Sequence, residues 1–368
     1  MHPLFGSAPH VLLKAARQGG GVPSARLPML ALLLVSTGLR WPLSLAEQAV
    51  QARKLGRARG RIQPVFIVGH WRSGTTHLYN TLSQGDFGYV TPLAAGLPWD
   101  QAGLAAGLKP LLERMLPKRR FIDNIPVTPQ SPQEDEVPLA NMTTLSLYHA
   151  LYFPRRFEAT FRRAVFFDGA EPAEIEAWQE ALDYFLRKVW IQQGRKQLLI
   201  KNPAYTGRID RLKALYPGAK FIHAVRNPFE VFVSMRNFYA KLLPQFALAD
   251  YNHIDIEDFI LKTHTRMMRD YRSASAEIPA GDLVEVRFDA LESDPMGAMQ
   301  HVYETLNLPG FAETEPRFAA YLKSVDGYRK NSFALDAGTI ERVSEACAET
   351  IAHWNFPIPA PRPAEAAA

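Results

Sequence analysis

With 368 residues, of which 47% are hydrophobic, the chain is long and apolar enough for one large or two modest globular domains. Its net charge of +5 suits an anionic ligand or an acidic membrane surface, although a basic composition without a specific partner explains it equally well, and we predict no nucleic-acid partner. The single cysteine, Cys347, excludes an intrachain disulfide framework and fits a reducing compartment, and the scattered histidines lack zinc-ligand spacing.

The first 60 residues are predicted to form an N-terminal extension, in which basic residues precede a short apolar segment at positions 27–37. This segment is too short to span a bilayer before Arg40 and Pro42 interrupt it. We therefore favour a short helix that packs on the core or lies on a membrane. A cleaved export signal, with a weak cleavage site at positions 44–46, comes second, and a membrane span comes last.

A dense basic run closes the extension and consists of Arg53, Lys54, Arg57, Arg59 and Arg61. It predicts either peripheral contact with an anionic membrane or a solvated linker, and we weigh the two interpretations equally. The expected location is the cytoplasm, with the inner face of the membrane as the place of any such contact. The oligomeric state stays open.

Strands and helices alternate between residues 61 and 356, and a disordered Pro/Ala tail is predicted for residues 357–368. Continuous apolar strands between helices predict an α/β fold of P-loop type, a three-layer α/β/α arrangement with a mainly parallel sheet. In such sheets ligands bind beyond the carboxyl ends of the strands. The predicted strands are 64–69, 197–201, 220–225 and 283–288, and the predicted helices are 74–83, 173–192, 206–215, one from 228, 255–276 and one from 295.

The first strand runs into a loop with the spacing of a nucleotide-binding P-loop, Gly69, four residues, then Gly74-Thr75-Thr76. Thr75 stands where a P-loop has its lysine. Arg72 supplies a cation in its place, and the hydroxyls of Ser73, Thr75 and Thr76 add uncharged donors. Backbone amides at the start of the next helix would complete an anion site. A plain strand-to-helix turn is the alternative.

Two further strand ends carry a cation. Lys201 ends one strand, and Arg226 ends the next, just before a helix start signalled by Asn227 and Pro228. Ser234 lies about two turns into that helix. Three cations at neighbouring strand ends predict a shared polyanion. A kinase using ATP and magnesium would instead need an Asp at a strand end, for which only residues 164–168 (AVFFD) offer a candidate.

These residues are similar to the sulfotransferases that use 3′-phosphoadenosine 5′-phosphosulfate (PAPS), in particular the bacterial and tyrosylprotein-like branch. The matching pieces are residues 71–76, Arg226 with Ser234, and residues 287–295, within a likeness that covers about 62–335. The resemblance implies PAPS as co-substrate and no required metal. It also implies that the nucleotide is bound by Trp71, Arg72, Ser73, Gly74, Thr75, Thr76, Arg226, Ser234, Arg329 and Lys330.

The implied reaction is in-line transfer of a sulfuryl group to an acceptor hydroxyl or amine, in which Arg72 and Lys201 stabilise the charge on the leaving group. Proline stands at 203, where the cytosolic branch has a histidine, so the base must lie elsewhere. The segment from Gln133 to Glu136 resembles an E-D-E stretch of bacterial members. We favour Glu134 slightly over Glu136, with a solvated charge run as the alternative and His77 and His149 in reserve.

Residues 84–165 are too long for a simple connection and are predicted to form the acceptor site and its lid. Their apolar residues suggest a lipid or another apolar acceptor, although ordinary core packing explains them too, and a carbohydrate or small metabolite stays open. Two other functions are left open, a P-loop kinase using ATP and magnesium and a catalytically inactive nucleotide-binding module. The apolar residues in question are Leu145, Leu147, Tyr148, Leu151, Tyr152 and Phe153.

Overall fold

The computed structural model describes residues 2–58, 60–101, 103, 107, 109–114, 116, 126–325 and 335–361. At its centre lies a four-stranded parallel sheet with the order β2-β1-β3-β4. Each strand falls within a predicted range, and the α/β prediction is confirmed. The strands are β1 (Val65–Val68), β2 (Leu199–Lys201), β3 (Lys220–Val225) and β4 (Leu283–Arg287).

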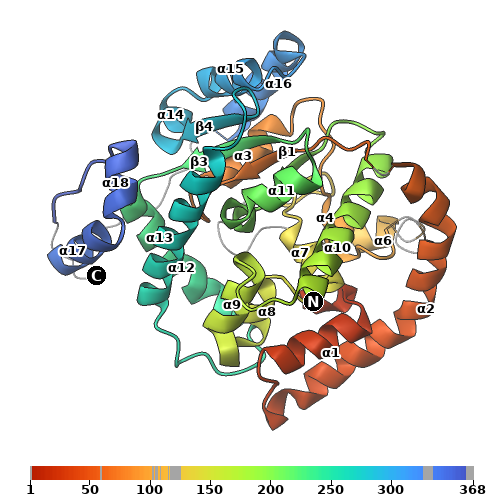
Figure 1. The fold of residues 1–368 in the computed structure, drawn as a ribbon. Helices are drawn as coiled ribbons and strands as arrows, with labels where there is room; N and C mark the ends of the chain where they lie inside the picture. The colour runs from red at the N-terminus through yellow and green to blue at the C-terminus, as the bar shows by residue number, and fades with distance from the viewer. Residues whose placement is uncertain are drawn as a thin grey trace.

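Helices cover both faces of the sheet and give the molecule three layers (Figure 1). Side chains alternate along β1, so that Phe66 and Val68 join one hydrophobic cluster while Val65 and Ile67 join another. The first cluster includes side chains of α10 (Pro172–Gln192), α11 (Ile209–Leu215), α12 (Pro228–Phe246) and α13 (Ile256–Ser275). The second includes side chains of α3 (Thr75–Leu82), α14 (Phe288–Ser293), α15 (Pro295–Thr305) and α16 (Phe311–Ser324).

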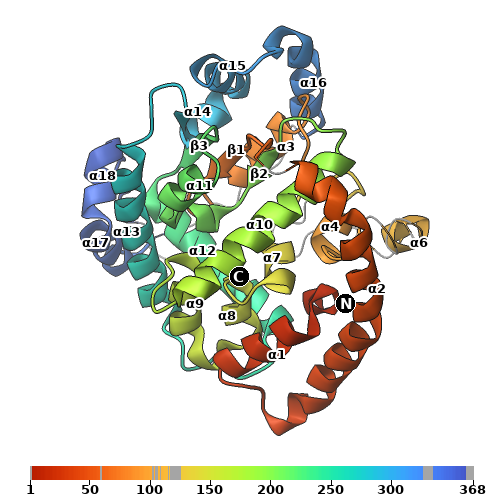
Figure 2. The same cartoon turned by 45° about the vertical axis from the view of Figure 1, so that its right-hand side comes forward.

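Helix starts follow the predicted capping signals. The side chain of Asn227 accepts a hydrogen bond from the Phe229 amide at 3.1 Å, and α12 begins at Pro228. α11 begins at Ile209, later than predicted, because Asn202 caps a 3₁₀ turn that occupies Pro203–Gly207. The last helices, α17 (Ala337–Ala346) and α18 (Ala348–Trp354), lie on the side of the molecule away from the N-terminal helices (Figures 1 and 2).

The segment 84–165 is mainly helical where it is described. Of the apolar residues that suggested an acceptor site, Leu145, Leu151, Tyr152 and Phe153 are buried in the first cluster. Ordinary packing, the alternative interpretation, accounts for these four side chains. The helices are α4 (Pro92–Gly96), α6 (Lys109–Arg114), α7 (Glu136–Met142), α8 (Tyr148–Tyr152) and α9 (Phe157–Val165).

Residues 164–168, the candidate strand of a magnesium site, do not form a strand. They end α9 and turn away from it, and Asp168 forms ion pairs with Arg162 and Arg266. The short length of the apolar run and the arginines before it suit a helix end better than a buried strand. Asp168 therefore does not stand at the end of a strand, where the magnesium-binding carboxylate of a kinase is expected.

The N-terminal helix is much longer than predicted. After α1 (Pro9–Gln18), helix α2 runs unbroken from Leu27 to Ala58, through Pro42 and into the basic run. A proline inside a helix removes one backbone hydrogen bond. Long-range contacts compensate for that loss. Arg40 pairs with Asp100, and Glu47 pairs with the buried Lys188 at 2.7 Å.

Replacing Glu47 tests how firmly α2 is held. The Lys188 ammonium binds Glu47 and the carbonyls of Pro98 and Trp99, and burial lowers its pKa while Glu47 raises it. Glu47→Ala should lower the free energy of unfolding by about 3 kcal/mol, because it leaves a buried charge without a counter-charge. Urea denaturation measures this change. Glu180→Ala, an exposed carboxylate on α10, is the control and should change stability little; equal losses in both variants would contradict the prediction.

Candidate active site

Two glycines shape the loop that follows β1. Gly69 has φ 134°, and a Cβ there would lie 2.3 Å from the Ala224 carbonyl oxygen. Gly74 has φ 91°, and a Cβ there would lie 2.2 Å from a ring carbon of Phe288. Both positions therefore require glycine. The Gly69 amide donates to Thr206 Oγ1 at 2.7 Å, which fixes the start of the loop against the chain after β2.

Some side chains of the loop pack in the interior, and others lie at the site. Trp71 packs in the core against Phe161, and Ser73 donates its hydroxyl to the His70 carbonyl at 2.7 Å. Burial lowers the pKa of His70 to about 4, so this loop histidine is neutral at pH 7. Arg72 has φ 70°, a conformation that non-glycine residues rarely adopt outside functional sites.

The structure brings Arg72, Arg226 and Ser234 together, as the sequence predicts. Arg72 donates from Nε to Ser234 Oγ at 2.8 Å, and Arg226 donates from Nη1 to the Arg72 carbonyl at 3.0 Å. The Arg226 guanidinium also lies over the Phe288 ring, 4.0 Å from its centre, and binds Glu230 at 2.7 Å. Arg226 thus forms a salt bridge with Glu230 and contacts the loop at the same time.

Lys201 reaches the same loop from the end of β2. Its Nζ lies 3.3 Å from Thr76 Oγ1 and forms an ion pair with Glu134. The Lys201 side chain is only 2% exposed, whereas Glu134 retains 17% of its exposure. Of the carboxylate triplet Glu134, Asp135 and Glu136, Glu134 is therefore the one that pairs with Lys201 and keeps contact with solvent.

The other two carboxylates of the triplet face inward. Asn202 donates from Nδ2 to Asp135 at 2.9 Å and to Glu136 at 2.8 Å. Glu136 also accepts from the Leu147 amide at 2.9 Å and lies 3.5 Å from an Arg208 nitrogen, so both of its oxygens are occupied. Burial raises the pKa of Asp135 to about 7, although its hydrogen bond with Tyr205 opposes the rise.

Sequence analysis missed the residues that hold this triplet in place. Asn202, Tyr205 and Arg208 all follow Lys201 within seven positions, on the turn that leads into α11. The only sequence feature that pointed to these residues was the polar pair Lys201-Asn202 at a strand end. Of the reserve histidines, His149 is buried with both ring nitrogens against backbone carbonyls, at 2.8 and 3.2 Å. Arg329 and Lys330 lie outside the described residues.

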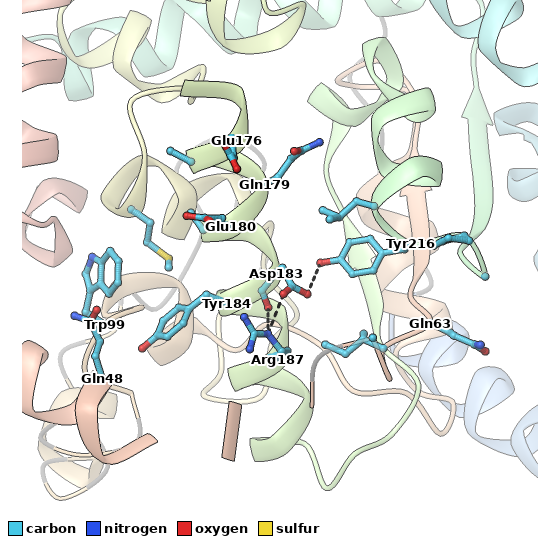
Figure 3. A pocket seen from close by; sticks show the side chains of 18 residues that line it. Gln48, Gln63, Trp99, Glu176, Gln179, Glu180, Asp183, Tyr184, Arg187 and Tyr216 are labelled. Atoms are coloured by element: carbon cyan, nitrogen blue, oxygen red, sulfur yellow. Dashed lines mark hydrogen bonds and ion pairs between the residues drawn. The ribbon is translucent and has the colours of Figure 1, made fainter. Parts of the chain in front are cut away.

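A separate pocket of about 930 Å³ lies near the amino ends of β1 and β3, whereas the predicted site lies at the carboxyl ends of the strands (Figure 3). It is lined by residues just before β1 and β3 and by the solvent side of α10, where Asp183 contacts both Arg187 and Tyr216. None of the predicted site residues lines it. Within the described ranges, no group of three or more His, Cys, Asp or Glu residues is placed to hold a metal ion.

Comparison with solved structures agrees with this architecture. The sulfotransferase STF9 from Mycobacterium avium superposes with a TM-score of 0.70 and 17% identity, covering 96% of this chain and 98% of that one. The sulfotransferase STF1 from Mycobacterium tuberculosis superposes with a TM-score of 0.63 and 17% identity, covering 92% and 90%. At this level of identity the likeness concerns the fold alone.

Sequence comparison gives evidence on the family as well as the fold. Among curated proteins, the omega-hydroxy-beta-dihydromenaquinone-9 sulfotransferase Stf3 of Mycobacterium bovis is 29% identical over 327 residues, which cover 88% of this chain and 82% of that protein. The Mycobacterium tuberculosis protein of the same name gives the same values. A model of the sulfotransferase family matches residues 64–313, the region that holds the loop, both strand-end cations and the carboxylate triplet. This chain therefore belongs to the sulfotransferase family.

Proposed function

We propose that this sulfotransferase takes its sulfuryl group from PAPS and transfers it to a hydroxyl of an apolar, isoprenoid-like acceptor. The observation that carries the donor assignment is the convergence of Arg72, Lys201 and Arg226 on one glycine loop that lacks the P-loop lysine. The acceptor assignment rests on the similar protein whose name specifies a hydroxylated menaquinone.

The loop suits a nucleotide with a 5′-phosphosulfate. Residues 72–76 lead into the amino end of α3, where the backbone amides of the first turn and the helix dipole favour an anion. Ser234 contacts the Arg72 side chain, and Arg226 contacts the Arg72 backbone carbonyl. Together Arg226 and Ser234 would bind a second phosphate, the 3′-phosphate that distinguishes PAPS from ATP. PAPS has no γ-phosphate and needs no magnesium bridge, so a lysine at position 75 is dispensable.

Glu134 is assigned as the base and Lys201 as the cation of the leaving group. The acceptor oxygen forms a bond to sulfur while the bond from sulfur to the 5′-phosphate oxygen breaks, the acceptor proton passes to Glu134, and the electron pair stays on the departing nucleotide. The ion pair between Glu134 and Lys201 links the two roles. An anion bound at the loop competes for the Lys201 ammonium, which frees Glu134 for the acceptor hydroxyl.

A calorimetric titration tests the donor site. The chain should bind 3′-phosphoadenosine 5′-phosphate without magnesium and should not bind ATP with magnesium. Arg226→Ala should weaken binding roughly 10- to 100-fold, because a hydrogen bond to a charged group contributes about 1.5–3 kcal/mol. Arg236→Ala, which removes an exposed arginine of the same helix, is the matched control and should bind normally. Preference for ATP with magnesium would overturn the donor assignment.

Two carboxamide variants test the base. Glu134→Gln should lower kcat of the folded enzyme by about 10²- to 10⁴-fold, the usual contribution of a general base, and it should also lower the free energy of unfolding because the buried Lys201 loses its counter-charge. Glu136→Gln should lower the free energy of unfolding by about 3 kcal/mol, because Arg208 loses its buried counter-charge, while the folded fraction keeps its turnover. Steady-state kinetics and urea denaturation measure the two effects. Unchanged turnover in Glu134→Gln would place the base elsewhere.

Direct sulfation assays test the acceptor class. The enzyme with radiolabelled PAPS should sulfate a detergent-dispersed isoprenoid that carries a terminal hydroxyl. The same isoprenoid without its hydroxyl is the control and should gain no label, because no nucleophilic oxygen is present. Labelling of a sugar in place of the isoprenoid would refute the apolar acceptor and leave the donor assignment intact. No transfer to either acceptor, together with intact nucleotide binding, would support a catalytically inactive module.

A further inference from the structure

Helix α2 exposes an unusual amount of apolar surface. Eleven large hydrophobic side chains are exposed in the part of the chain that the structure describes, and eight of them belong to this one helix. Figures 1 and 2 show α2 along the outer edge of the molecule, with α1 on its inner side. The eight residues are Leu27, Met29, Leu32, Val35, Leu39, Leu43, Leu45 and Val50.

Five of these side chains form a single stripe. Leu32, Val35, Leu39, Leu43 and Val50 follow one another at intervals of three, four, four and seven residues, which places them on one face of an α-helix. Leu39 is 78% exposed and Val50 is 76% exposed, so most of each side chain is open to solvent. The stripe therefore lacks a covering element among the described residues.

Positive charge continues the same face. Arg53, Lys54 and Arg57 are exposed and lie three, four and seven residues after Val50, so they extend the stripe toward the carboxyl end of the helix. The only acidic residue of α2 is Glu47, which is buried against Lys188. The outward face of α2 thus presents apolar and cationic groups and no carboxylate of its own.

The opposite face of α2 is fixed to the domain by polar contacts. Arg40 pairs with Asp100 and donates to the Ser7 carbonyl at 2.6 Å, and Ser44 donates to Asp100. By length and composition alone, the helix Ser24–Ala58 could cross a membrane, yet its most apolar window is only 17% buried, which excludes a core helix. Crossing a bilayer would pull Arg40 and Glu47 from their partners into hydrocarbon, at a cost of several kcal/mol.

We propose that the outward face of α2 docks in the plane of an anionic lipid bilayer. An apolar stripe that continues into lysine and arginine is the pattern of a helix that lies in the interface, with its cations on acidic headgroups. A second copy of this face offers no carboxylate of α2 to pair with these cations, whereas the headgroups of an anionic bilayer supply negative charge. This assignment does not depend on the identity of the sulfuryl donor or acceptor.

Vesicle flotation with the full-length chain tests the proposal. We expect binding to phosphatidylcholine vesicles that contain 30% phosphatidylglycerol, and at least tenfold weaker binding to vesicles of phosphatidylcholine alone. The triple variant Arg53→Gln, Lys54→Gln, Arg57→Gln should bind roughly 100-fold more weakly, since each basic residue near an anionic surface contributes about 1 kcal/mol. The double variant Leu39→Gln, Leu43→Gln should also lose binding, because it removes the apolar part of the contact.

A matched control removes equally exposed apolar side chains from other elements. Leu111→Gln with Ile358→Gln should bind vesicles like the wild type, since neither residue lies on α2. Far-UV circular dichroism and thermal melting establish that every variant is folded. Equal binding to neutral and anionic vesicles, or equal loss in the control, would overturn the proposal.

Two further measurements distinguish in-plane docking from a membrane span and from a dimer. Resistance to extraction by alkaline carbonate would show that α2 spans the bilayer and would refute in-plane docking. A dimer in light scattering that Leu39→Gln with Leu43→Gln converts to a monomer would assign the face to a second copy. In-plane docking predicts full extraction by carbonate and the same oligomeric state for the double variant and the wild type.

Discussion

The buried ammonium of Lys201 sets the arrangement of the site. A charge removed from water needs a counter-charge at contact distance, and Glu134 provides it from a segment 67 residues away in the sequence. Holding Glu134 there requires the following residues to be fixed as well. Asn202, the neighbour of Lys201, bonds to both Asp135 and Glu136. The end of β2 therefore contacts the carboxylate segment and the loop after β1 at once.

The loop after β1 is built without the P-loop lysine. Gly69 and Gly74 allow a tight path between the Ala224 carbonyl and the Phe288 ring, and that path places Arg72 in a left-handed conformation beside Ser234. Arg226 in turn donates to the Arg72 carbonyl. Positive charge thus comes from residues at the ends of three neighbouring strands, which spreads it over a wider anion than a single lysine could cover.

Sequence reasoning predicted the elements whose signals are local. The strands were visible as apolar runs, α12 began at its Asn227-Pro228 signal, and Arg226 and Ser234 met Arg72 as their spacing implied. It favoured Glu134 over Glu136 only slightly, because partners on the chain after β2 decide which carboxylate turns inward. It also ended the N-terminal helix too early at Pro42, since the contacts that hold α2 come from Asp100 and Lys188.

Buried ion pairs are what join the distant parts of this chain. Glu47 with Lys188 attaches α2 to α10, and Glu136 with Arg208 attaches α7 to the turn after β2. Such pairs contribute little net stability compared with apolar packing, but the loss of one partner is severely destabilising, so they specify one arrangement over others. The same rule distinguishes the two faces of α2. Its inward charges are all paired, so the exposed cations and leucines on the other face are the groups left available to a membrane.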